Sequence, residues 1–244
     1  MNIIENKQLP APALGIIAVV GWTAVIYLAY VGAHDAVMRT FFSVATLTSN
    51  MPAEVASHPF EGRYVEHPWM TLLHSVPGFL FMTLGPLQFM SLIRKRWIHL
   101  HRMSGRIYLG VCTLVAIGAI WMGFAFPIWG WTVNQWGTLG YSLLLLFFVF
   151  KAYRHIRARQ FAQHREWMIR GFATGLSIAT FRVLLDEVLL PIGLDFTTAW
   201  NTVVHISFPI NLAAAEFWIR ATRPRKLPAV KADSSLVVPG RVVT

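Results

Sequence analysis

Four of the nine histidines lie inside apolar stretches or at their edges, where polar side chains are rare and usually functional. These four are His74, His101, His164 and His205. Two of them are followed four residues later by a glycine, Gly78 after His74 and Gly105 after His101. Because positions i and i+4 share one face of a helix, each imidazole would lie beside a flattened strip of helix surface. Such a strip suits a large flat ligand, and it also suits the close packing of two helices.

Depth sorts these histidines into an outer pair and an inner pair. At 1.5 Å per residue, His74 lies about 8–10 Å and His205 about 13–15 Å inside predicted membrane spans from the outer side. His101 and His164 begin spans at the inner edge. Two imidazoles facing each other across a bundle suit the iron of b-type haem, whereas Zn²⁺ prefers four close ligands.

The sequence therefore favours haem b as a cofactor, with the four histidines as iron ligands. Arg102 and Arg106, near the inner pair, could neutralise the haem propionates. A simpler interpretation stands beside this one. Glycine next to a polar residue is ordinary helix packing, and the arginines at the inner edge could hold the surface against anionic lipid.

A second polar group lies at Arg182, roughly 12 Å inside a span by the same rise. An arginine at this depth needs a partner, and Asp186 follows at i+4 on the same helix. With Glu187, His74 and His205, these residues could form a polar cavity in the outer half of the membrane. Such a cavity suits a quinone headgroup, a proton path or a small polar substrate, and the alternative is an ion pair within one helix.

Composition predicts the scaffold that holds these residues. Hydrophobic residues make up 55% of the 244 positions and charged residues only 13%, about half of the share that a soluble domain carries. Stretches of about 20 apolar residues predict membrane-spanning helices. Six such stretches occur, at roughly 12–32, 69–93, 104–126, 133–152, 167–190 and 196–219. We therefore expect an all-α, polytopic membrane bundle.

The net charge of +10 comes from basic segments between the spans, which argues against a nucleic-acid-binding face. Lysine and arginine concentrate in 94–106, 151–170 and the tail, and this pattern places both termini on the cytoplasmic side. We expect a six-span domain over 1–225, with a long outer loop at 33–68 and a loose cytoplasmic tail at 226–244. The lipid bilayer, with anionic lipid at its inner face, is the expected surrounding.

Several motifs resemble, in order, those of a family of bacterial predicted membrane proteins. They are His74-x-x-x-Gly78, GPLQF (85–89), HRMSGRIYL (101–109), HREWMIR (164–170), FRVLL (181–185) and NLAAAEFWIR (211–220). The resemblance covers about 70–220 and implies a helical protein of the bacterial cytoplasmic membrane, without implying an activity. His205 lies outside these motifs. The placement of histidines on helices is also similar to the architecture of transmembrane diheme b-type cytochromes.

Three functions follow as hypotheses. The first is electron transfer through b-type haem, linked to quinone, with His101 and His164 as inner ligands and His74, with His205, outside. The second is a non-catalytic accessory or assembly subunit of a larger membrane complex, whose polar residues pack helices and bind lipid or partner subunits. The third is a carrier of a small molecule or metal ion through the outer polar cavity.

Overall fold

A computed structural model describes residues 10–51, 61–125 and 133–223, and every regular element in these ranges is helical. Six helices are long and apolar enough to cross a membrane, as predicted. They are α1 (Ala11–Leu47), α4 (Pro68–Phe89), α6 (Ile98–Ala125), α7 (Val133–Arg157), α8 (Phe161–Arg182) with the π-helix η1 (Val183–Leu189) that continues it, and α9 (Phe196–Ala221). Two short helices join them, α3 (Glu61–Glu66) and α5 (Ser91–Arg96).

The first helix differs from the expectation of a long loop from residue 33. It continues to Leu47, so that residues 33–47 of the expected loop are helical. Small residues recur with helical spacing beyond residue 32, and the charges of Asp35 and Arg39 neutralise each other one turn apart. At 37 residues the helix is about 55 Å long, well beyond a hydrocarbon core of about 30 Å. Residues 52–60 and the predicted tail at 226–244 lie outside the described residues.

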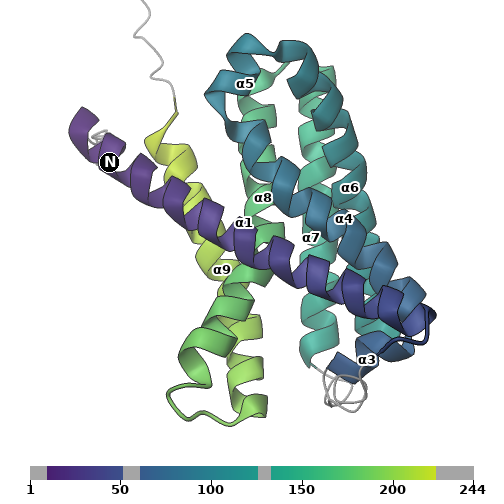
Figure 1. The fold of residues 1–244 in the computed structure, drawn as a ribbon. Helices are drawn as coiled ribbons and strands as arrows, with labels where there is room; N and C mark the ends of the chain where they lie inside the picture. The colour runs from purple at the N-terminus through teal and green to yellow at the C-terminus, as the bar shows by residue number, and fades with distance from the viewer. Residues whose placement is uncertain (1–9, 52–60, 126–132, 224–244) are drawn as a thin grey trace, which may run out of the picture.

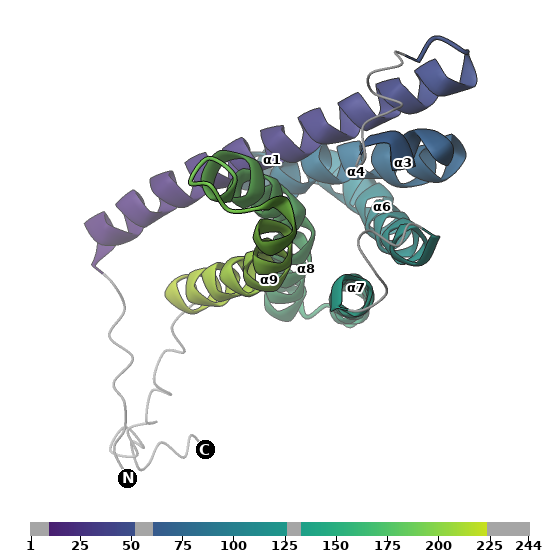
Figure 2. The same cartoon turned by 90° about the horizontal axis from the view of Figure 1, so that it is seen from below.

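Helices α4, α6, α7 and α8 form a bundle in which consecutive helices pack against each other. Helix α1 crosses this bundle obliquely and packs along α4, with a smaller contact to α8 (Figure 1). Figure 2 shows α1 along one side of the bundle and α9 beside α8. The end that carries α5 and the start of α8 also carries most of the arginines. We call it the basic end, and the end that carries α3 and η1 the opposite end.

The centre of the bundle is a stack of aromatic rings. Phe81 of α4 lies between Tyr108 of α6 and Phe172 of α8, with ring centroids 5.3 and 5.8 Å apart. All three rings are buried. Two glycines make room for them, because a Cβ at Gly85 would collide with Phe172 and a Cβ at Gly175 with Phe81. The glycines therefore set how closely α4 and α8 approach.

The return from η1 to α9 is a tight turn. Gly193 has φ of +92°, a conformation that favours glycine. The Asp195 carboxylate then caps α9 by accepting the backbone N–H of Thr198 at 3.0 Å. Hydrogen bonds from Thr198 hold the pKa of the Asp195 carboxyl below its usual range. The turn and the cap together fix the start of α9 at Phe196, next to η1.

Replacing Gly175 with alanine tests the ring stack. The new Cβ would meet Phe81, which is only 1% exposed and has rings on both sides, so it cannot move aside cheaply. We expect a loss of about 1–3 kcal/mol, measured as a lower thermal midpoint in detergent. Gly140→Ala is the matched control, since a Cβ there meets nothing within 4 Å and alanine favours a helix. Equal midpoints for the two variants would contradict the packing.

Candidate functional site

An ion cluster joins two membrane-spanning helices, α1 and α8. The Arg39 guanidinium donates to the Asp35 carboxylate from Nε at 3.0 Å and from Nη2 at 3.2 Å. The guanidinium of Arg182 approaches the same carboxylate at 3.8 Å. Because Arg39 is only 6% exposed, its charge depends on this partner. The cluster joins α1 to the end of α8.

His74 and Tyr64 complete the cluster from α4 and α3. The His74 Nδ1 donates to the carbonyl oxygen of Val115 on α6 at 3.2 Å, and the ring lies against Gly118 of the same helix. The charges of Asp35 and Arg39 act on this imidazole. Arg39 also lies over the Tyr64 ring, 3.7 Å from its centroid. Four helices thus contribute polar groups to one place, and the His74 Nε2 keeps its lone pair.

Arg182 stands where the α-helix changes to a π-helix. It is the last residue of α8, and η1 carries Asp186 and Glu187, both exposed. The Glu187 carboxylate accepts the Tyr27 hydroxyl of α1 at 2.9 and 3.0 Å. The sequence suggests Asp186 as the partner of Arg182, and the structure adds Asp35 from a different helix. Single π turns inside helices often occur at functional sites.

Sequence reasoning missed Asp35 and Arg39, because both fall in the segment taken as an outer loop. A signal was present. Small residues recur every three or four positions from the first span into this segment, at Ala29, Gly32, Ala36 and Ser43, and Arg39 continues the same spacing. This spacing is typical of a helix with one buried face, and it would have placed both charged residues inside the protein.

His205 is not part of the cluster. It lies exposed on α9, and its Nδ1 donates to the carbonyl oxygen of Asn201 in its own helix at 2.6 Å. His74, in contrast, lies between α4 and α6. The two histidines of the predicted outer pair therefore lie in different surroundings, His74 against α6 and His205 exposed on α9.

The inner pair of histidines lies at the basic end. His101 continues the buried face of α6 that carries Gly105, Tyr108 and Cys112. His164 continues the face of α8 that carries Gly171 and Phe172, and its Nδ1 donates to the carbonyl oxygen of Ala152 on α7 at 2.9 Å. The two imidazoles are near enough for their charges to interact. The Nδ1 of His101 is buried and has no hydrogen-bond partner among the described residues.

The two glycines singled out with the histidines have different surroundings. A Cβ at Gly78 would meet nothing within 4 Å, so this strip of α4 is open. At Gly105 a Cβ would lie 3.2 Å from the Gln88 side-chain oxygen, and the Gln88 amide donates to the Ser104 hydroxyl at 2.7 Å. Gly105 thus takes part in contact between α4 and α6.

The arginines of the basic end divide into two groups. Those on α8 have partners near the end of α9: Arg170 pairs with Glu216, and Arg165 donates to the Thr222 hydroxyl at 2.8 Å. Arg102 and Arg106 on α6 are exposed, and no salt bridge to either occurs in the described ranges. The charge of Arg102 acts on His101, so this arginine lies beside the inner imidazoles.

Asp35→Asn tests the ion cluster. The substitution leaves two guanidinium groups without their shared carboxylate. Since the Asp35 side chain is 33% exposed, we expect a loss of about 1–3 kcal/mol, below the 3–5 kcal/mol of a fully buried pair. Adding Arg39→Gln should restore part of the loss. Thermal midpoints in detergent measure both. Glu66→Gln, at an exposed carboxylate, should change little, and strictly additive losses would argue against coupling.

Comparison with known proteins agrees with the predicted resemblance. Residues 71–219 match a family model described as "Predicted membrane protein (DUF2306)". This range runs from α4 into α9 and includes His74, His101, His164 and Arg182. No curated protein and no solved structure matches the chain. The chain therefore belongs to the DUF2306 family of predicted membrane proteins, and it is an integral membrane protein with six candidate spans.

Proposed function

We propose that this protein binds one b-type haem at the basic end, between His101 and His164, and transfers electrons to or from quinone. The observation that carries the proposal is the hydrogen bonding of the ring nitrogens of these two histidines. Nδ1 of His164 is fixed on a backbone carbonyl, which leaves the Nε2 lone pair available, as in many metal-ligating histidines. Among the described residues the buried Nδ1 of His101 has no hydrogen-bond partner, which is costly unless a ligand engages that nitrogen.

The surrounding charges fit a haem. Arg94 and Arg102 both act electrostatically on His101, so cations are near the place where two propionates would need neutralising. Haem iron supplies reversible one-electron transfer, and its axial ligands tune the reduction potential. The part of the chain is to orient both imidazoles, hold their tautomers and balance the propionate charge. Arg106 lies one turn after Arg102 on α6 and is exposed, and this role does not need it.

The ring stack limits how many haems the bundle can hold. Tyr108 and Phe172 fill the interior two turns beyond His101 and His164, so the cofactor would lie between the stack and the basic end. His74 faces the ion cluster and His205 lies exposed on another helix. These placements favour one haem over the two of a diheme cytochrome.

The ion cluster supports the link to quinone. A quinone headgroup presents two carbonyl oxygens, which accept hydrogen bonds. The cluster brings the guanidinium groups of Arg39 and Arg182, which are hydrogen-bond donors, to one carboxylate. The imidazole of His74 and the carboxylate of Asp35 are groups that can take up or release a proton during reduction or oxidation of the headgroup.

A second candidate function is that of an accessory subunit in a larger membrane complex. One observation favours it. The first half of α1 packs on almost nothing: Ile16 and Val19 are 67% and 68% exposed, and a Cβ at Gly15 or Gly21 would meet nothing within 4 Å. Small residues on an open helix face allow a helix of another protein to approach closely. Co-purification of a stoichiometric partner that is lost with Gly21→Leu would support this candidate.

The proposed orientation puts the basic end at the cytoplasm. Arg94, Lys95 and Arg96 on α5, and the arginines that start α8, gather there, and cytoplasmic segments carry an excess of such residues. Both termini would then be cytoplasmic in a bacterial cytoplasmic membrane, with the ion cluster towards the outside.

Alanine variants test the haem site. His101→Ala and His164→Ala should each abolish the α band in a reduced-minus-oxidised visible spectrum, because a low-spin haem needs both axial ligands. His99→Ala is the matched control, since it removes an exposed imidazole two residues away. Haem content per chain is measured in parallel. A full haem signal in both alanine variants, with insertion unchanged, would contradict the proposed ligands.

Cysteine labelling tests the orientation. The native Cys112 is 1% exposed, so background labelling should be low. In intact cells a membrane-impermeant maleimide should label Thr197→Cys at the opposite end and leave Arg96→Cys at the basic end unlabelled; both sites are exposed. Lysed membranes should label both. The reverse pattern in intact cells would place the basic end outside.

A further inference from the structure

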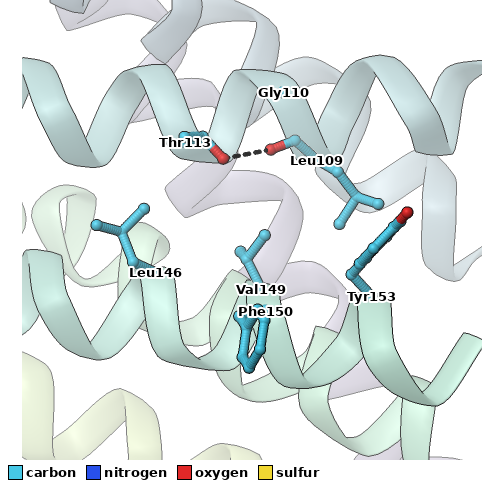
Figure 3. A pocket seen from close by; sticks show the side chains of 7 residues that line it. All are labelled: Leu109, Gly110, Thr113, Leu146, Val149, Phe150 and Tyr153. Atoms are coloured by element: carbon cyan, nitrogen blue, oxygen red, sulfur yellow. Dashed lines mark hydrogen bonds between the residues drawn. The ribbon is translucent and has the colours of Figure 1, made fainter.

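A groove of about 450 Å³ runs between α6 and α7 on the surface of the bundle. Leu109, Gly110 and Thr113 line it from α6, and Leu146, Val149, Phe150 and Tyr153 from α7 (Figure 3). The lining is almost entirely apolar, and the Thr113 hydroxyl is used within its own helix, where it donates to the carbonyl oxygen of Leu109 at 3.0 Å. The groove therefore offers apolar contact and little hydrogen bonding.

Gly110 keeps the groove open. A Cβ at this position would meet nothing within 4 Å, so a larger side chain would enter the groove without disturbing the helices. The groove has a direction as well. Tyr153 and Leu109 lie together at one end in Figure 3, and because α6 starts and α7 finishes at the basic end, this is the end nearest the arginines.

Three arginines continue the groove towards the basic end. Arg106 lies three and four residues before Leu109 and Gly110, and hence on the same face of α6. Arg154 and Arg157 lie four residues after Phe150 and Tyr153 on α7, and the Arg154 guanidinium lies over the Phe150 ring at 5.9 Å. All three are exposed, and in the described parts of the chain no salt bridge involves them.

We propose that this groove is a binding site for one anionic phospholipid, with an acyl chain along the apolar lining and the phosphate between the three arginines. Charge complementarity selects this occupant. The apolar part alone would accept any chain, but three cations at one end favour a ligand that is anionic where its chain begins. A neutral phospholipid or an isoprenoid quinone would leave those cations unbalanced. The groove lies between α6 and α7, whereas the proposed haem lies between His101 of α6 and His164 of α8, and the ion cluster lies at the opposite end.

Titration of the purified, delipidated protein tests the site. Phosphatidylglycerol and phosphatidylcholine are added separately, and bound lipid is counted by native mass spectrometry. We expect one phosphatidylglycerol per chain, bound more tightly than phosphatidylcholine. Gly110→Phe should remove this binding by filling the groove. The double variant Arg106→Gln/Arg154→Gln should weaken phosphatidylglycerol about thirtyfold, at the usual contribution of a basic residue near a membrane surface, and phosphatidylcholine little.

Two matched controls separate the groove from general effects. Gly140→Phe places the same side chain at a second open glycine, which lies on α7 outside the groove. Arg96→Gln removes a different exposed charge from the basic end. Both should bind as the unaltered protein does. Equal affinity for the two lipids, or unchanged binding in Gly110→Phe, would overturn the proposal. Retention of an isoprenoid quinone in place of phospholipid, lost with Gly110→Phe, would also overturn it.

Discussion

The contact of aromatic rings with glycines fixes the spacing of the bundle, and the polar sites at both ends depend on it. In a bilayer, lipid tails are as apolar as leucine, so helices associate through close packing and polar contacts. Phe81 fits over Gly175, and Phe172 over Gly85, which lets α4 and α8 approach with α6 against them. At one end this spacing leaves His101 and His164 near enough for their charges to interact, and at the other it leaves Arg182 within reach of α1.

Polar contacts then attach the outer helices to the bundle. Asp35 and Arg39 join α1 to Arg182, and the Thr40 and Ser75 hydroxyls bond at 2.9 Å between α1 and α4. At the basic end the Arg170–Glu216 pair joins α8 to α9. The ion pairs place charges where an unpaired charge would be costly, so they fix position as well as adding stability.

The sequence was sufficient to predict the membrane-spanning helices and the family, because the length of an apolar stretch and the order of short motifs can be read directly from the chain. It predicted six helices and the family resemblance, and both are confirmed. The haem hypothesis built on the histidines stays a prediction. It was insufficient to place Asp35 inside the protein, because charges within a long polar segment suggest a loop unless the spacing of Ala29, Gly32 and Ala36 is followed.

The sequence was also insufficient to predict which glycines make close contacts between helices. Gly78 is open and Gly105 lies against Gln88, whereas a Cβ at Gly85 or Gly175 would collide with a buried ring. Which helix faces which glycine depends on tertiary packing that spacing alone does not specify.

Electron paramagnetic resonance of the frozen, oxidised protein tests the central claim, that two imidazoles share one haem iron. The protein is purified with haem supplied during expression, and its spins are counted against its chains. We expect a low-spin ferric signal typical of two imidazole ligands, integrating to about one per chain. A high-spin signal would mean that one imidazole does not bind, and the absence of any ferric signal would leave the accessory-subunit function as the account of this protein.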